Sequence, residues 1–189
     1  SRVLILGIAM VVAACGSVVA ATWRVEKDGS GDFTVIQDAV DAAADGDTIA
    51  IGPGRYDDFE LNEFSAWIIA MVFDKSLSFI GSGIGSTVLG PASLEEGPDD
   101  SPVHGVYGIV VAAGYARTRI RGISFEHFKT RGIHFEGGRG EIEDCEFRHS
   151  GRGVLGVLPD GGWIRDCRFI DNDVFQNASV SFHETVGMV

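Results

Sequence analysis

The chain of 189 residues carries 15 Lys and Arg against 27 Asp and Glu, a formal net charge of −12, and 45% of its residues are hydrophobic. This apolar content suffices for a folded core and excludes a disordered or collagen-like chain, while the acidity argues against a nucleic-acid binder, which needs a basic face. Three cysteines are too few for a disulfide scaffold, and 26 glycines predict many tight turns between short elements.

An export signal is predicted at the N-terminus. Residues 3–14 are almost wholly apolar, follow a basic residue and precede a run of small residues. This order predicts a signal peptide over residues 1–21 and leaves residues 22–189 as the mature domain. Two alternatives stay open: a lipobox that would make Cys15 the lipidated N-terminus, and an uncleaved membrane anchor. All three predict export, as a secreted protein or to the cell surface or periplasm.

One helix is predicted, over residues 34–44, where apolar residues recur at helical spacing on one face. Thr34 followed by Gln37 fits a capping box, in which the two side chains satisfy free amides of the first turn. Gly46 is expected to end the helix. The alternating residues 48–51 then predict a strand that stops at a Gly-Pro-Gly turn.

Short strands separated by glycine-rich breaks are predicted after this turn. They cover residues 77–80, 87–89, 108–111 and 119–125. Two acidic stretches, residues 57–63 and 95–100, interrupt the pattern and are expected to form solvated surface loops. A calcium site built from their carboxylates is the alternative, although the sequence shows no EF-hand-like ligand spacing.

A repeat with a period of 22 residues is the most informative feature. The template Ile-x-x-x-x-Phe begins at Ile120 and recurs at Ile142 and Ile164. A fixed period in this range is typical of repeat architectures, in which each unit buries its apolar face against its neighbours. The strand-and-turn composition predicts an all-β fold, a parallel β-solenoid of about 22 residues per coil. The side chains expected to stack inside are the three isoleucines and Phe125, Phe147 and Phe169.

Outward positions of the repeat support this register. Neighbours one period apart repeatedly carry opposite charges, as in the column of Arg121, Glu143 and Arg165. Opposite charges in contact stabilise a sheet. Asp144 above Asp166 is the exception and is expected at a turn, where the carboxylates splay into water. Other columns expected on the outside are Arg119, Glu141 and Trp163, and Ser124, Glu146 and Arg168.

Cys145 and Cys167 also lie one period apart. In-register side chains point the same way rather than at each other, so two buried free thiols that pack as small hydrophobes are expected. A disulfide, which export would permit, stays open. The sequence contains no Cys/His cluster with the spacing of a zinc site.

Two segments have a recognisable pattern. The first segment is made of residues 23–43 together with residues 46–56. Residues 46–56 read Gly-Asp-Thr-Ile-Ala-Ile-Gly-Pro-Gly-Arg-Tyr, and the second segment is residues 78–90. They resemble the opening segment, and the next strand and turn, of the pectin-lyase-like right-handed parallel β-helix proteins, with the pectinesterases closest. The resemblance covers nearly all of residues 23–182. It implies a right-handed parallel β-helix whose open N-terminal end is capped by the predicted α-helix.

The catalytic residues of the pectinesterases do not carry over. That family stabilises the reacting ester with two glutamines and uses two aspartates as nucleophile and acid/base. In this chain Arg131 and Gly151 stand near the two glutamine positions, and of the aspartate motif only Asp173 matches. A shared fold does not imply a shared function. A non-enzymatic function is therefore favoured, and Asp173 is the catalytic candidate of the alternative.

Three residues are candidates for carbohydrate binding. Trp163 is expected outside the coil beside Arg165, and His134 is expected to face outward on a neighbouring strand. An exposed aromatic ring beside polar groups offers a platform for the C–H face of a sugar. The alternative for Trp163 is that it covers Glu141 and a loop.

A second group of candidates follows the core phenylalanines. His127, His149 and Asp171 share one repeat position and form a surface ladder, which could bind a metal or transfer protons. The alternative is a polar turn ladder that faces water. Asp144 and Asp166 are the candidate metal ligands, for Ca²⁺, which the resembled lyases use; no other cofactor is expected.

The sequence therefore predicts an exported β-helix protein that recognises polysaccharide or a cell-surface partner along one face of the solenoid. The alternative is a carbohydrate-active enzyme, similar to a pectin or polyuronate lyase or a pectinesterase, with part of its active site beyond Val189. No nucleic-acid partner is expected, a membrane is expected to be contacted only through a lipid anchor, and a monomer is expected. Because the last coil would leave strand edges unpaired, the domain is expected to continue past Val189.

Overall fold

The computed structural model describes residues 19–99, 105–112, 114, 116–156, 161–172, 180–182 and 187–188. Most of the predicted signal peptide, including the lipobox residue Cys15, lies outside the described residues, and so does Asp173. In the part of the chain that the structure describes, no helix is long and apolar enough to cross a membrane.

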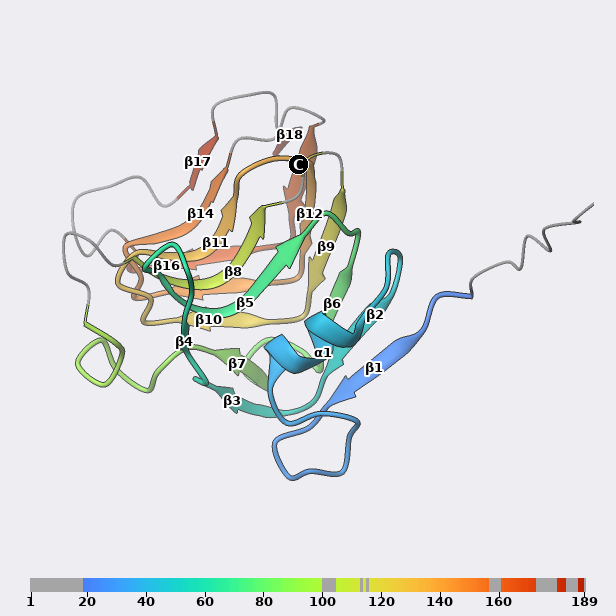
Figure 1. Ribbon diagram of the computed structural model, residues 1–189. Coiled ribbons are helices and arrows are strands. Elements are labelled where there is room, and N and C mark those ends of the chain that lie inside the picture. Colours follow the sequence, from blue (N-terminus) through green and yellow to red (C-terminus); the bar gives the residue numbers. More distant parts are fainter. Residues whose placement is uncertain are drawn as a thin grey trace, which may run out of the picture.

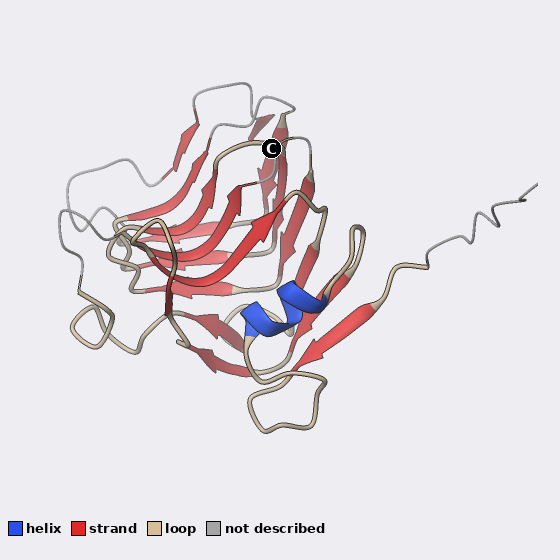
Figure 2. Ribbon diagram, in the orientation of Figure 1, coloured by secondary structure: helices blue, strands red, loops and turns tan. Residues whose placement is uncertain are grey.

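The described residues form mostly β-structure, in three sheets beside one short helix (Figures 1 and 2). Sheet A contains, in spatial order, β1 (Thr22–Val25), β2 (Thr48–Ile51), β6 (Ser78–Gly81), β9 (Arg117–Arg121), β12 (Arg139–Glu143), β15 (Gly162–Arg165) and β18 (Gly187–Met188). Sheet B contains β3 (Gly54–Tyr56), β7 (Thr87–Leu89), β10 (Ser124–Glu126), β13 (Glu146–Arg148) and β16 (Arg168–Ile170). Sheet C contains β4 (Glu60–Leu61), β5 (Trp67–Phe73), β8 (Val106–Ala112), β11 (Arg131–Phe135), β14 (Arg152–Gly156) and β17 (Val180–Phe182). Paired strands are parallel except β4 and β5, which are antiparallel.

The predicted core columns are confirmed. The residues that pair one above the other are Ile120, Ile142 and Ile164 in sheet A, and Phe125, Phe147 and Phe169 in sheet B. Successive phenylalanine rings are stacked with centroids 5.0 Å apart and planes 9° apart. The stack fits because sheet C presents glycines opposite it, among them Gly132, where a Cβ atom would lie 3.1 Å from the Phe147 ring.

The 22-residue period is correct only for part of the coil. It holds in sheets A and B from Ile120 onward, but in sheet C Ile133 pairs with Val154, 21 residues later. Earlier coils are longer, since Phe79 pairs with Ile120, 41 residues later. Insertions between strands absorb the difference in length, so the expectation of a uniform coil of about 22 residues is wrong for the first half of the chain.

Two turns in each repeat place a residue in the left-handed region of backbone conformation. The φ angles are 51° at Asp144 and 52° at Asp166 in the turn that follows sheet A, and 60°, 50° and 47° at His127, His149 and Asp171 in the turn that follows sheet B. Aspartate and histidine are enriched among the non-glycine residues in this region. Asp144 and Asp166 therefore lie at a turn, as predicted.

Helix α1 (Ile36–Ala42) is shorter than predicted and lacks the predicted capping box. Its N-cap is Val35, and no side chain caps it. The side-chain oxygen of Gln37 instead accepts the N–H of Met71, at 2.8 Å. Met71 lies on β5, so Gln37 satisfies the sheet backbone rather than the helix. The helix also ends before Gly46, because the chain is already extended at its C-cap.

Helix α1 covers the N-terminal end of the core. It packs against β1 and β2 of sheet A and against β5 of sheet C (Figure 1). Its residues Ile36, Ala39 and Val40 are buried in the same apolar cluster as the inward side chains of the sheets. The end of the core that would otherwise face water is thereby closed.

The strand predictions need three corrections. Residues 119–125 do not form one strand, because the turn between β9 and β10 divides them between two sheets. Residues 57–63 are not wholly loop, since β4 pairs with β5. Strand β5 was not predicted: it is apolar along its whole length, which gives none of the alternation that marks a half-buried strand.

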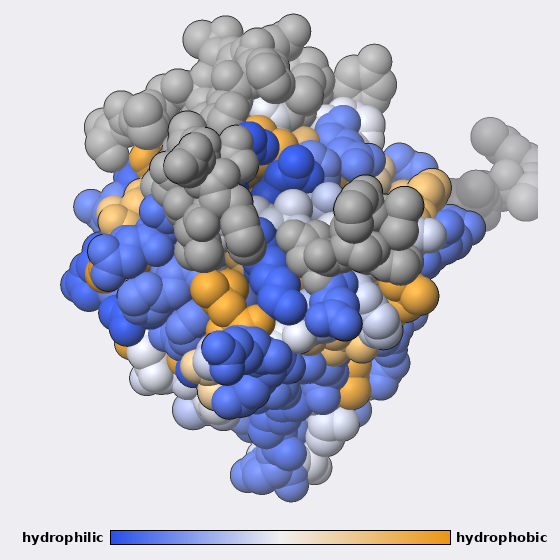
Figure 3. Space-filling model, turned by 90° about the vertical axis from the view of Figure 1, so that its left-hand side faces the viewer, coloured by the Kyte–Doolittle hydropathy of each residue, from blue (hydrophilic) through white to orange (hydrophobic). Residues whose placement is uncertain are grey.

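The outward columns are less exposed than predicted. Seen from the left-hand side of Figure 1, the surface is mainly hydrophilic with small hydrophobic areas (Figure 3). However, Ser124, Glu141 and Glu146 are buried, although they were expected on the outside. Long neighbouring side chains cover the two carboxylates: Arg148 bonds Glu146 at 2.7 Å, and three arginines surround Glu141.

The two cysteines of the repeat are free thiols in the structure. Cys145 is buried, and its Sγ donates to the backbone oxygen of Glu143 at 3.3 Å. Burial raises the pKa of the Cys145 thiol well above its usual value, whereas the hydrogen bond from Cys145 lowers the pKa of Cys167. Cys145 therefore packs as a small, neutral hydrophobe.

A pH-dependent loss of stability is expected at Tyr56. This side chain is fully buried, and its hydroxyl donates to the backbone oxygens of Val25 and Gly52 at 3.1 and 3.3 Å. Burial raises its pKa to about 12, above the value of about 10 for an exposed tyrosine. The folded state thus holds the hydroxyl proton more tightly than the unfolded state does. The stability that the protonated Tyr56 contributes is complete below about pH 10 and is lost as the pH rises toward 12.

The urea midpoint of unfolding, followed by circular dichroism, is expected to fall over this alkaline range. In Tyr56→Phe, which has no titratable hydroxyl at this position, the fall should be smaller. Parallel curves for the two proteins would contradict the assignment to Tyr56.

Candidate functional site

The residues predicted to bind carbohydrate lie on two different faces. Trp163 and Arg165 belong to β15 in sheet A, whereas His134 belongs to β11 in sheet C. Asp173 lies outside the described residues. The surface ladder lies at the turn that leads from sheet B to sheet C and comprises His127, His149 and Asp171. The structure therefore does not unite these candidates in one site.

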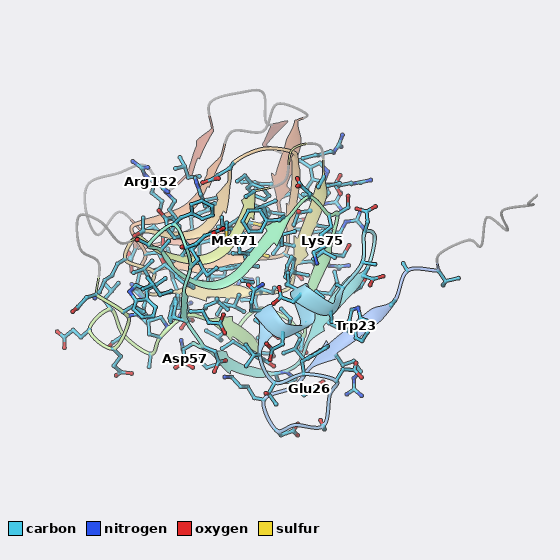
Figure 4. The ribbon with its side chains drawn as sticks, in the orientation of Figure 1. Trp23, Glu26, Asp57, Met71, Lys75 and Arg152 are labelled. Carbon is cyan, nitrogen blue, oxygen red and sulfur yellow. The ribbon has the colours of Figure 1, made fainter. Side chains whose placement is uncertain are left out.

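The outer face of sheet C carries a groove. An apolar cluster separate from the main core lies there and consists of Ile68, Met71 and Val110, packed against Ala66, Tyr107 and Ala112. Two hollows of about 450 and 260 Å³ adjoin over β5 and share Asn62, Met71 and Phe73. We name them together the sheet C groove. Its lining runs from Gln37, Asp41 and Lys75 beside α1 to Tyr107, His134 and Glu136 (Figure 4, where Met71 and Lys75 are labelled).

One end of the sheet C groove is built from an aromatic and basic cluster. The rings of Tyr107 and His134 are stacked, with centroids 5.6 Å apart. The guanidinium of Arg131 lies 5.3 Å from the centroid of the Tyr107 ring, and its Nη1 donates to the Tyr107 hydroxyl at 3.2 Å. The strand register produces this cluster, since Arg131 pairs with Tyr107 and, on the other side, with Arg152.

His134 is a neutral imidazole near pH 7. Burial and the positive charge of Arg131 lower its pKa, although the carboxylate of Glu136 opposes this effect. Its Nε2 lies 3.2 Å from Glu136 Oε1. Its Nδ1 is buried. A neutral imidazole donates through only one nitrogen. With Nδ1 buried and Nε2 facing Glu136, His134 orients that carboxylate and offers no free polar atom of its own.

The middle of the groove exposes two aromatic rings. Phe64 is 63% exposed and Phe73 is 46% exposed, and their ring centroids are 6.5 Å apart. The loop that carries Phe64 is held by Asn62, whose side-chain oxygen accepts the N–H groups of Phe64 and Ala66 at 3.1 and 2.9 Å. Asn62 also donates to the sulfur of Met71 at 3.4 Å. The loop is thus fixed to the floor of the groove.

Sequence reasoning found one residue of this groove and missed the others. His134 was a candidate, but Tyr107, Phe64 and Phe73 were not. The signal that could have found them is β5, whose continuous apolar run requires cover on both faces of the sheet. Because the main core covers only one face, the other has to be covered by something else, here the loop at Phe64.

Trp163 and Arg165 form a separate pair on the outer face of sheet A. The Arg165 guanidinium lies 4.3 Å from the centroid of the Trp163 ring, and its Nη2 donates to Glu143 at 2.6 Å. Trp163 pairs in register with Glu141, which is fully buried. This position agrees with the alternative in which Trp163 helps to cover Glu141.

The two histidines of the predicted surface ladder lie one above the other. The rings of His127 and His149 are stacked, with centroids 5.3 Å apart and planes 10° apart. His127 Nδ1 lies 3.0 Å from the backbone oxygen of Pro91, whereas Asp171 is exposed. Among the described residues, no group of three or more His, Cys, Asp or Glu side chains is placed to hold a metal ion. Calcium binding at Asp144 and Asp166 stays a prediction.

Comparisons of the chain with protein-family models, with curated proteins and with solved structures give no match.

Proposed function

We propose that this chain is an exported, right-handed parallel β-helix of the pectin-lyase-like kind, and that it binds polysaccharide in the sheet C groove without chemical turnover. The fold part of the proposal is supported by three parallel sheets visited in turn and by the helix that covers the N-terminal end of the core. Export is supported by the apolar segment at residues 3–14.

The observation that carries the function is the composition of the groove. Its larger hollow, of about 450 Å³, lies within the usual size range of ligand sites. Phe64, Phe73 and Tyr107 offer apolar ring surface for the C–H faces of sugars, and the carboxylates of Glu60 and Glu136 line the same hollows and can accept from their hydroxyls. An elongated groove with this alternation suits several consecutive sugar rings better than a single small ligand.

Chemical turnover has less support. The pectinesterases, which this chain resembles in sequence, use two glutamines, and the residues near those two positions are different here. Arg131 is engaged with Tyr107, and Gly151, at the turn before β14, has no side chain to polarise an ester. The alternative remains a carbohydrate-active enzyme, a pectin or polyuronate lyase or a pectinesterase, that uses Asp173.

Binding to a panel of immobilised polysaccharides tests this proposal. For a polysaccharide that binds, Tyr107→Ala is expected to weaken the affinity about tenfold, or about 1.4 kcal/mol, because a stacking surface is lost. Tyr107→Phe keeps the ring and should retain most of the affinity. Trp163→Ala lies on the other face and serves as the matched control, with no change expected.

Three outcomes would overturn the proposal. They are the absence of binding to every polysaccharide, a loss of affinity in Trp163→Ala but not in Tyr107→Ala, and release of cleaved or de-esterified product that stops in Asp173→Ala. The second outcome would move the binding face to sheet A, and the third would establish the enzymatic alternative.

A further inference from the structure

A buried carboxylate on the outer face of sheet A gathers three arginines around it. Glu141 has 0% exposure. Its Oε1 lies 2.5 Å from Arg117 Nη2 and 3.1 Å from Arg139 Nε, and its Oε2 lies 3.1 Å from Arg119 Nη2. The arginine side chains remain 45–55% exposed. Burial alone would raise the pKa of the Glu141 carboxyl, but the arginines hold it below its usual value, so the cluster carries a net charge of about +2 near neutral pH.

The strand register concentrates further positive charge on this face. Arg121 pairs with Glu143, which pairs with Arg165 on the next strand. Strands β9, β12 and β15 thus carry five outward arginines against two outward glutamates, in a chain whose net charge is −12. The excess of positive charge is local and opposite in sign to the rest of the molecule, so it is expected to attract anions to this face.

A hollow adjoins the arginine cluster. It has a volume of about 230 Å³ and is lined by Gly46, Ser76, Leu77, Ser78, Arg117 and Arg119. Ser78 pairs in register with Arg119, and Ser76 Oγ accepts the backbone N–H of Arg117 at 3.1 Å. In this hydrogen bond the Ser76 hydroxyl is the acceptor. The bond does not use the hydroxyl proton, which is therefore available to a ligand.

The carboxylates near this hollow already accept hydrogen bonds from protein N–H groups. Asp47 accepts the N–H groups of Ala21 and Ala44 and the indole N–H of Trp23, at 2.7, 2.8 and 3.0 Å. Asp45 accepts the N–H of Ser76 at 2.7 Å. Glu141 has two oxygens for three guanidinium groups with five N–H donors each, so it occupies only part of their hydrogen-bonding capacity. The hollow therefore presents donors: guanidinium N–H groups and serine hydroxyls.

We propose that this hollow binds a tetrahedral oxyanion, a phosphate or sulfate group. Arg117 and Arg119 would bind two of its oxygens with charge-assisted hydrogen bonds, and the hydroxyls of Ser76 and Ser78 would donate to a third. Glu141 acts as a positioning residue, because it fixes the arginines that contact the anion. The site is independent of the sheet C groove and would bind its group whether that group is free or carried by a sugar.

Calorimetric titration of the full chain with inorganic phosphate and with sulfate, at constant ionic strength, tests the proposal. Saturable binding with a Kd of about 1 mM is expected for the wild-type chain. Arg117→Gln and Arg119→Gln should each weaken it about tenfold. Arg24→Gln is the matched control, because Arg24 lies on β1 of the same sheet and is an exposed arginine that forms an ion pair with Glu26. No change is expected.

Ser76→Ala keeps the test valid if an arginine variant fails to fold. It leaves the arginine cluster intact, removes one hydroxyl donor and should weaken binding about threefold. Tighter binding of a monosaccharide phosphate than of inorganic phosphate, with no binding of the unphosphorylated sugar, would show that the group is carried by a glycan. Equal affinity would indicate the free anion. A linear, unsaturable response, or one that Arg117→Gln, Arg119→Gln and Ser76→Ala all leave unchanged, would overturn the proposal.

Discussion

Replacement of Phe147 by alanine is expected to lower the free energy of unfolding by about 3–5 kcal/mol. Phe147 is the middle ring of the core stack, fully buried, with Phe125 and Phe169 each 5.0 Å away between centroids. Its removal withdraws apolar surface from the core and leaves a cavity that both neighbouring rings line. Because the strands on either side are tied by parallel hydrogen bonding, the coil has little freedom to close the gap.

Chemical denaturation, followed by circular dichroism, measures this loss. Phe169→Ala is the informative comparison, because Phe169 packs against the same core but is only partly buried. Its loss should be smaller, and Phe147→Leu should recover most of the stability of the wild-type chain. An equal loss for Phe147→Ala and Phe169→Ala would mean that the stack does not stabilise the coil in the way its geometry indicates.

The sequence predicted this core because its register can be checked within the sequence itself. A repeat places identical residue types above each other, and a shift by one residue would turn every inward side chain outward. Ile120, Ile142 and Ile164 therefore determine one another's positions. The same logic predicted the turn at Asp144 and Asp166, since two like charges in one column fit only where the chain bends away from the sheet.

The sheet C groove could not be predicted in this way. It depends on β5 and the loop at Phe64, which lie in a coil of 30 residues, and on Tyr107, which lies in the next coil, of 41 residues. Neither coil shares a template with the repeat. Most of the groove lies in the coils that precede the 22-residue period. Only the continuous apolar run of β5 carried a signal, and such a run does not by itself reveal which segment covers it.

Alternation also failed to predict burial on the outer faces. Glu141 points outward, as expected from its neighbour Ile142, but it is buried beneath longer side chains of its own face. A pattern of inward and outward positions gives the direction of a side chain, whereas its exposure depends on the length of its neighbours in space. Arginine has the length to cover a carboxylate on the neighbouring strand.

Replacement of Gly132 by alanine is expected to lower the free energy of unfolding by about 1–3 kcal/mol, because it overpacks the core opposite the phenylalanine stack. A Cβ atom at this position would lie 2.9 Å from the backbone oxygen of Gly153 and 3.1 Å from atoms of Phe125 and Phe147. The parallel strand and the ring stack would both have to move. Gly114→Ala is the matched control, since a Cβ atom there meets nothing within 4 Å in the described part of the chain. The stability of this variant should be nearly unchanged.

The double variant Gly132→Ala/Phe147→Ala separates the two contacts. If the ring is the main obstacle, alanine at position 132 costs clearly less once the Phe147 ring is absent, and denaturation reveals a coupling between the two sites. If the two losses simply add, the obstacle is the Gly153 backbone, and glycine is required by the close approach of β11 and β14. The additive result is expected, because the closest approach, 2.9 Å, is to the Gly153 backbone oxygen, which the parallel pairing of β11 and β14 holds in place.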